Sequence, residues 1–164
     1  MRGFWNDPGA TAAQVDADGW IAVGDLGRFD DLGNRVLCGR TGEMYVRGGY
    51  NVYPLEVEHV LAEHSAVAAV AIIGTTAPVI GEIGIAYVVP HVRPTDPAGL
   101  AAELRSWVRD RLADYKAPDR FEFVDQLPLT SMMKIDKRAL RSALAPDAAP
   151  TAEMDNIASL GARP

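Results

Sequence analysis

The chain has 164 residues, of which 48% are hydrophobic and 23% charged, as in an ordinary globular protein of one domain or of one small domain with part of another. The net charge of −6 argues against general nucleic-acid binding, and a single cysteine, Cys38, excludes a disulfide framework and a cysteine zinc cluster. No apolar run is long enough to span a bilayer and the first residues contain no signal core, so we expect a cytoplasmic protein without an integral membrane segment.

The first part of the chain predicts short strands separated by turns. The segments WIAVGD (20–25), GRFD (27–30) and RVLCG (35–39) are short apolar pieces between turn residues. Between the last two, DDLGN (30–34) predicts a hairpin turn. We therefore expect a β-meander of roughly two or three hairpins, which has little to bury on its own.

The part from Met44 onward shows patterns of both helix and strand. Apolar residues at helical spacing, with a proline or an aspartate near each start, predict helices at 54–64, 96–115 and 135–145. Apolar or alternating runs predict strands at 67–74, 82–90 and 120–127, the first two buried on both faces. This order predicts an α+β fold in which helices flank a three-stranded sheet.

Four stretches in order resemble the adenylate-forming enzymes, which include acyl-CoA synthetases, luciferases and peptide-synthetase adenylation domains. They are GFWNDPGATAAQVDADGWIAVGDLGRFDDLGN (3–34), GRTGEMYVRGGYNVYPLEVE (39–58), LADYKAP (112–118) and LPLTSMMKIDKRAL (127–140). One such motif alone is a weak signal, but four with the family's order and spacing, over residues 3–145, are a strong one. The pattern is most similar to that of fatty-acyl-CoA ligases.

The resemblance implies a division of the chain into three parts. Residues 1–41 are expected to be terminal β-strands of the large AMP-binding domain, which is incomplete here. Residues 42–145 are expected to be the small C-terminal lid domain, with β-hairpins and with a hinge at its start. Residues 146–164 are polar and rich in small side chains, and we expect a disordered tail.

The resemblance also implies a reaction, in which ATP and a carboxylic acid give an acyl-adenylate and CoA then gives the acyl-CoA. This predicts a ligase of fatty acid metabolism that uses ATP, with Mg in the complete enzyme, and CoA. The sequence contains no phosphate-cradling loop and no segment for an acyl tunnel, so we expect inactivity without a large AMP-binding domain, in cis or in trans. The alternative is a non-catalytic remnant or interaction module whose exposed strands drive self-association.

The nucleotide contacts implied by the resemblance are Asp25 and Arg40. A carboxylate offers paired acceptors to the ribose hydroxyls of ATP, and a guanidinium suits phosphate oxygens. From the residues alone, a turn-forming aspartate is the better interpretation of Asp25, and Arg40 reads as a surface arginine or a partner for Glu43. Gly42 stands at the implied hinge, where the family usually has Asp or Lys, and a small residue can absorb a large backbone rotation.

Gly48, Gly49 and Asn51 are implied to form the loop that lines the pantetheine path of CoA, because glycine allows close approach of the backbone to a ligand. The alternative is a plain turn between a strand and a helix.

Lys134 is the candidate catalytic residue, implied to bridge the substrate carboxylate and the α-phosphate and to offset charge in the transition state. The family commonly has glycine immediately before this lysine. Met133 would strain the loop if that position requires a positive φ. Lys137 is a weaker candidate that we expect to cap or solvate the following helix.

The remaining polar candidates are expected to be structural. His59, His64 and His91 lack the spacing of metal ligands, so no metal site is predicted. Lys116 and Trp107 are expected to support the loop and the core. Glu56 and Glu58 are expected to favour the helix dipole rather than to act as an acid–base pair.

Overall fold

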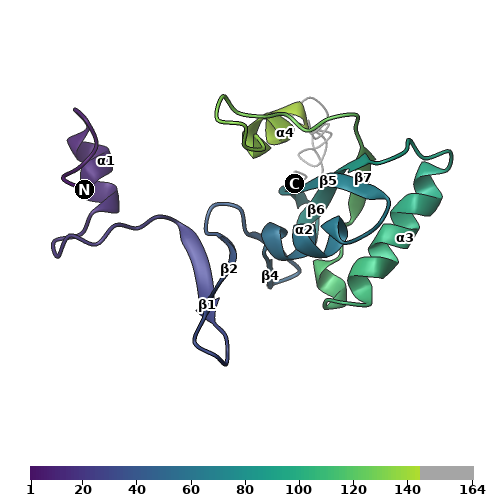
Figure 1. The fold of residues 1–164 in the computed structure, drawn as a ribbon, viewed down its shortest axis with the longest axis horizontal. Helices are drawn as coiled ribbons and strands as arrows, with labels where there is room; N and C mark the ends of the chain where they lie inside the picture. The colour runs from purple at the N-terminus through teal and green to yellow at the C-terminus, as the bar shows by residue number, and fades with distance from the viewer. Residues whose placement is uncertain (145–164) are drawn as a thin grey trace, which may run out of the picture.

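The computed structural model describes residues 1–144, where a five-stranded mixed sheet forms the centre of the larger body (Figure 1). The predicted tail, 146–164, lies outside the described residues. The strand order is β4-β3-β6-β5, and β7 pairs in parallel with β6. The strands are β3 (Tyr45–Arg47), β4 (Tyr50–Val52), β5 (Val67–Ala77), β6 (Gly81–Pro90) and β7 (Arg120–Phe123). The three predicted strands are therefore β5, β6 and β7, and the hairpin β3–β4 adds two more to their sheet.

Helices cover both faces of this sheet, as Figure 1 shows. The helices are α2 (Pro54–Ala62), α3 (Pro97–Arg109) and α4 (Lys137–Ala143). On β5, Val70 and Ile72 join the core beneath α2 and α3, whereas Ala71 and Ile73 join the core beneath α4. This alternation confirms that the central strands are buried on both faces.

The predicted helix starts are confirmed, and two predicted ends are wrong. The Asp96 side chain accepts a hydrogen bond from Gly99 N at 2.9 Å, and that of Asp136 from Arg138 N and Ala139 N at 3.0 and 3.1 Å. The helix predicted over 96–115 ends at Arg109, and a separate 3-10 helix, η1 (Asp114–Lys116), follows. The strand predicted over 120–127 ends at Phe123, where the pairing with β6 stops.

The N-terminal arm, which we define as residues 1–41, contains one hairpin instead of the predicted meander. Its strands are β1 (Asp25–Phe29) and β2 (Arg35–Arg40). The predicted turn between them is confirmed, because Asp30 Oδ1 accepts from Leu32 N and Asn34 N at 3.0 and 2.8 Å. The strand predicted over 20–25 is wrong, since Ile21 makes only an isolated bridge with Val15.

A short helix, α1 (Pro8–Gln14), was not predicted. Asp7 Oδ1 caps it by accepting from Ala10 N at 2.8 Å, and Pro8 stands at its first position. The sequence therefore contained both start signals, but no apolar stripe accompanies them and the helix buries no residue.

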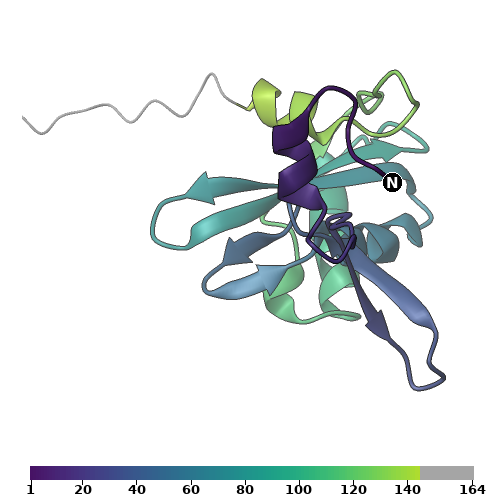
Figure 2. The ribbon, with the colours of Figure 1, turned by 90° about the vertical axis from the view of Figure 1, so that its left-hand side faces the viewer.

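The arm buries almost nothing, as the sequence predicted. Among residues 1–40 only Gly39 is buried, while Trp5 and Leu32 are 98% and 87% exposed. In Figures 1 and 2 the hairpin β1–β2 projects away from the five-stranded sheet. The body, which we define as residues 44–144, holds both apolar cores.

Tyr45, the first residue of β3, anchors the start of the body. Its ring lies over Gly74 and Gly84, which are paired residues of β5 and β6, and a Cβ on either glycine would collide with the ring. Only 1% of Tyr45 is exposed, and within residues 1–144 its hydroxyl has no hydrogen-bond partner. Burial, and secondarily the negative charge of Asp119, raises the pKa of Tyr45.

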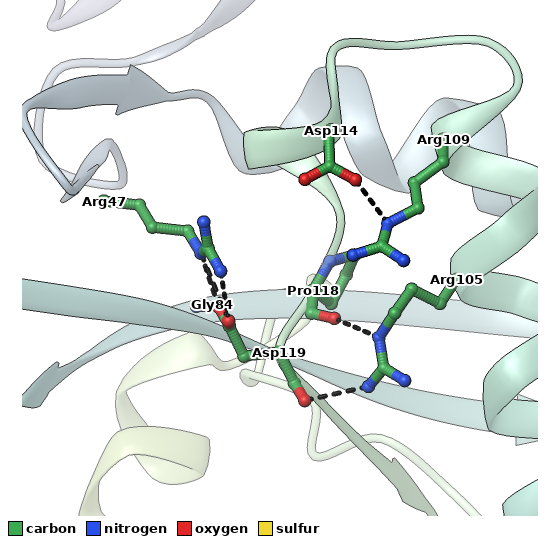
Figure 3. A network of polar contacts seen from close by, with 7 residues as sticks. All are labelled: Arg47, Gly84, Arg105, Arg109, Asp114, Pro118 and Asp119. Atoms are coloured by element: carbon green, nitrogen blue, oxygen red, sulfur yellow. Dashed lines mark hydrogen bonds and ion pairs between the residues drawn. The ribbon is translucent and has the colours of Figure 1, made fainter. Parts of the chain in front are cut away.

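A polar network holds the same strand to the body (Figure 3). Arg47 Nη2 lies 2.7 Å from Asp119 Oδ1, and Arg47 Nε donates to both carboxylate oxygens of Asp119 at 3.1 and 3.0 Å. Asp119 Oδ2 also accepts from Gly84 N at 3.3 Å, and Arg105 Nη2 donates to Asp119 O at 2.9 Å. Strand β3, strand β6, helix α3 and the start of β7 are thus joined at one residue, Asp119, through its carboxylate and its backbone carbonyl.

We expect Tyr45→Phe to keep or raise the free energy of unfolding at pH 7, by up to about 1–2 kcal/mol, because it removes a buried hydroxyl that has no partner within residues 1–144. The raised pKa of Tyr45 means that the unfolded chain loses the phenolic proton first. Ionisation of Tyr45 therefore leaves the free energy of unfolding of the wild type unchanged below about pH 10 and lowers it above that pH. The variant, which has no phenol at this position, should not show this decrease.

Urea unfolding of both proteins at pH 7 and pH 11 measures the two effects, with Tyr50→Phe, at a ring that is 59% exposed, as the matched control. A fall of more than about 1 kcal/mol at pH 7 in Tyr45→Phe alone would show that the hydroxyl has a partner after all.

Candidate functional site

A cleft lies where the arm meets the body. Its walls are formed by the hairpin β1–β2, the turn that follows it, helix α2 and the start of α4. The lining residues are Asp25, Leu37, Gly39, Arg40, Glu43, Leu55, Glu58 and Lys137. Two of them, Asp25 and Arg40, are the residues predicted to contact the nucleotide.

Asp25 and Arg40 are brought together at the end of the hairpin. They are paired residues of β1 and β2, and Arg40 Nε lies 2.7 Å from Asp25 Oδ1. The alternative partner of Arg40, Glu43, is therefore wrong. Within residues 1–144, Asp25 Oδ2 and both terminal nitrogens of Arg40 make no hydrogen bond, and the Arg40 side chain is 60% exposed. Acceptor and donor groups of opposite charge thus remain open to a ligand at one edge of the cleft.

On the other side of the cleft lies a half-buried ion-pair cluster of Glu43, Glu58 and Lys137. Lys137 Nζ is 2.6 Å from Glu43 Oε2 and 2.8 Å from Glu58 Oε1, and the three side chains are only 29%, 12% and 14% exposed. Glu58 Oε1 also accepts from Ile72 N at 2.6 Å. The expectation that Lys137 caps or solvates its helix is wrong, because its ammonium group is withdrawn from water between two carboxylates.

The glycine pair forms the turn of the hairpin β3–β4. Gly48 and Gly49 have φ values of 58° and 86°, and the flanking residues Arg47 and Tyr50 are paired. Positive φ at both central residues is the geometry of a type I′ turn, which explains why two glycines are adjacent. Asn51 follows on β4 with an exposed side chain. The plain-turn reading accounts for this geometry, and the pantetheine role of these residues stays a prediction.

Lys134 lies in an exposed loop between the bridged residues Leu129 and Ile135. The loop is closed by hydrogen bonds from Thr130 N to Lys134 O at 2.7 Å and from Lys134 N to Thr130 Oγ1 at 3.3 Å. Met133 has a φ of 60°, so the suspected positive-φ position is present and carries a methionine. This conformation strains the backbone of a residue with a side chain.

Ion pairing separates Lys134 from the other two lysines of this chain. Lys116 Nζ lies 2.6 Å from Glu56 Oε2, and Lys137 is held in the cluster described above. Within the described residues, Lys134 makes no ion pair, and the structure does not bring it into contact with Asp25 or Arg40. Its positive charge is therefore exposed and available, on a different body from the predicted nucleotide contacts.

Gly42 lies in the turn between β2 and β3. Glu43 N and Met44 N both donate to Arg40 O, at 3.1 and 3.3 Å. A Cβ at Gly42 would meet nothing within 4 Å, so the position is sterically open. The hinge role of Gly42 remains a prediction that this geometry permits.

His64 and Trp107 have structural contacts. His64 is buried, packs edge-on against Trp107 and lies 3.2 Å from Glu103 through Nε2. Trp107 is half-buried and donates to Val60 O at 2.8 Å. In residues 1–144 no three His, Cys, Asp or Glu side chains are grouped for metal binding, and no helix there is long and apolar enough to cross a membrane.

Comparison with known proteins places this geometry in a family. Residues 56–134 match the model of the AMP-binding enzyme C-terminal domain. A 3-[(3aS,4S,7aS)-7a-methyl-1,5-dioxo-octahydro-1H-inden-4-yl]propanoyl:CoA ligase of Mycobacterium tuberculosis is 44% identical, over 86% of this chain and 27% of the relative. A medium/long-chain-fatty-acid–CoA ligase of the same organism is 41% identical, over 85% of this chain and 25% of the relative.

A solved structure shows the same fold. It is the o-succinylbenzoate CoA synthetase of Bacillus subtilis in complex with its acyl-adenylate intermediate, with a TM-score of 0.76 and 35% identity, over 86% of this chain and 28% of that one. The chain thus spans about a quarter of the length of the relatives that it matches. It belongs, through its AMP-binding enzyme C-terminal domain, to the adenylate-forming enzymes, and it corresponds to the C-terminal part of the acyl-CoA ligases among them.

Proposed function

We propose that this chain supplies the lid, the hinge and two nucleotide contacts of an acid–CoA ligase, which acts together with a large AMP-binding domain. The observation that carries the proposal is the separation of charges. Asp25 and Arg40 lie on the arm, whereas Lys134, which has no ion pair within residues 1–144, lies on the body. A ligand bound between the two bodies would be contacted from both, and the connecting turn around Gly42 would set their relative pose.

In the adenylation step, Asp25 would accept hydrogen bonds from the ribose hydroxyls of ATP and Arg40 would contact its phosphates. Lys134 would place a positive charge between the acid carboxylate and the α-phosphate, where negative charge develops. An ammonium group used in this way need not transfer a proton. This role requires an ammonium group that no carboxylate neutralises before the substrate arrives, and within residues 1–144 Lys134 meets that requirement.

In the thioester step, the hairpin β3–β4 would border the path of the CoA pantetheine. The turn at Gly48 and Gly49 exposes backbone without side chains, and the Asn51 amide group is exposed beside it. The Tyr50 ring stacks on Tyr115 at a centroid distance of 4.6 Å, which ties this hairpin to η1. A rigid hairpin with a bare turn suits a narrow, extended ligand.

The exposed arm supports a division at the hinge, with residues 1–41 as terminal strands of the large domain and 42–145 as the lid domain. Apolar side chains such as Trp5, Trp20 and Leu32 are largely exposed, which favours a partner surface for the arm. We propose that this surface is the large domain and that the chain is inactive without it. We further propose a fatty acid as substrate, Mg with the ATP and a cytoplasmic location.

The same exposed apolar side chains favour a second candidate, a non-catalytic interaction module that self-associates through the arm. The two candidates differ in what the large domain of a CoA ligase does to the chain. A ligase part gains activity from it, whereas an interaction module gains none. Pyrophosphate exchange therefore separates them.

We expect no ATP–pyrophosphate exchange from the chain alone, and exchange when the chain is joined to the large domain of a matched CoA ligase. Lys134→Ala should lower this exchange about 10²–10³-fold, because it removes a fixed charge from the transition state. Arg138→Ala, at a neighbouring exposed cation, is the matched control and should change it little. Equal activity of Lys134→Ala and wild type would remove Lys134 from the mechanism, and absence of exchange in every fusion would favour the interaction module.

We expect Met133→Gly to raise the free energy of unfolding by about 0.5–1 kcal/mol, because glycine adopts the positive φ of this loop without strain. The control is Met132→Gly, since Met132 is equally exposed and has no positive φ, so glycine there should bring no gain. Urea unfolding of the three proteins gives the comparison. A loss of stability in both variants would show that Met133 is not strained.

A further inference from the structure

We propose that Lys137 is a positioning residue that, with Glu43 and Glu58, clamps the chain to the body on one side of Gly42 and so confines the pivot between arm and body to Gly42. The proposal rests on the proposed function, since it assumes that the two bodies change pose. The predicted hinge did not include these three side chains, and they come from segments far apart in the sequence.

The clamp on the body side is built from the turn, α2 and α4. Glu43 follows Gly42 directly, and its carboxylate lies 2.6 Å from Lys137 Nζ. Lys137 is itself held by Glu58 at 2.8 Å, and Glu58 is fixed by the bond from Ile72 N on the central strand β5. Since β5 belongs to the core of the body, the side chain of Glu43 is tied to the most buried part of the structure.

A second clamp holds the chain on the arm side of Gly42. Arg40 is paired with Asp25 across the hairpin at 2.7 Å. Thr41 donates to Gly24 O twice, from its backbone N at 2.9 Å and from Oγ1 at 3.2 Å. Residues 40 and 41 are thus fixed to the arm in the same way that residue 43 is fixed to the body.

Gly42 lies between the two clamps and has no side chain through which it could be held. No Cβ is present, and the space where one would stand is empty to 4 Å. Within residues 1–144, the only backbone bonds across it are those from Glu43 N and Met44 N to Arg40 O, in an exposed turn. A rotation of the arm against the body therefore concentrates at this residue as long as both clamps hold.

Lys137 is the residue on which the clamp depends most, because it is the only positive charge in the cluster with Glu43 and Glu58. Without its ammonium group, Glu43 and Glu58 would face each other as two uncompensated, half-buried carboxylates, and Glu43 would leave for solvent. Replacing Glu43 by glutamine is milder, because Glu58 still neutralises Lys137. Both changes release the segment after Gly42 from the body, so the pivot spreads toward Tyr45.

Amide hydrogen exchange on the chain as it stands tests the clamp without requiring any activity. We expect Glu43→Gln and Lys137→Met each to speed the exchange of the Glu43 and Met44 amides by about ten-fold or more, while the amides of β5 and β6 are unchanged. Lys137→Arg should restore most of the protection, and Arg138→Met is the matched control for the loss of a cation on α4.

Unchanged exchange of residues 43 and 44 in Glu43→Gln overturns the proposal. Faster exchange throughout β5 and β6 in Lys137→Met would show a general loss of stability in that variant. The exchange of residues 43 and 44 in Glu43→Gln, in which Lys137 keeps Glu58 as a partner, then decides whether the clamp exists. In a fusion that is active, the clamp further predicts that Lys137→Met changes the ratio of pyrophosphate exchange to acyl-CoA formation by several-fold, as a plain stability defect would not. If no fusion is active, the proposed function fails, but the exchange result still decides on the clamp.

Discussion

The packing of Tyr45 on two glycines fixes the point at which the chain enters the body. Gly74 and Gly84 are paired on β5 and β6, and the absence of both side chains leaves a flat area that one aromatic ring fills. Tyr45 comes three residues after Gly42, and Arg47, two residues further on, holds the same strand through Asp119. The body therefore begins abruptly, and the turn before Tyr45 is the place where a rotation meets the least packing.

Burial is divided very unequally between the two bodies. The body has an apolar core on each face of its sheet, whereas the arm has one short hairpin and a helix that buries no residue. An isolated two-stranded hairpin is marginally stable in water, so the shape of the arm depends on local bonds such as those of Asp30. This imbalance agrees with the proposed division, in which the lid stays folded by itself while the strands before it take their stability from another domain.

The sequence predicted what depends on local pattern and missed what depends on distant contact. The strands β5 and β6 and the caps at Asp96 and Asp136 follow from apolar runs and start signals, and they were found. The pairing of Lys137 with Glu43 joins residues 94 positions apart, and no periodicity points to it. The resemblance to a family identified the motifs, including the positive φ at Met133, but it did not say which charges the fold would neutralise.

Helix α2 is the element on which these motifs converge. Its acidic residues Glu56 and Glu58 stand two apart, and they bind Lys116 of η1 and Lys137 of α4 respectively. The loop near η1 and the start of α4 are thus tied to one helix by two half-buried ion pairs, and a third pair, Glu43–Lys137, ties the segment after the turn to α4. Lys134 is three residues before Lys137, close enough for its loop to be positioned by this anchor, yet it remains unpaired within residues 1–144. Because the other two lysines are paired with Glu43, Glu56 and Glu58, only Lys134 among the lysines has, within the described residues, the unpaired charge that the proposed adenylation role requires.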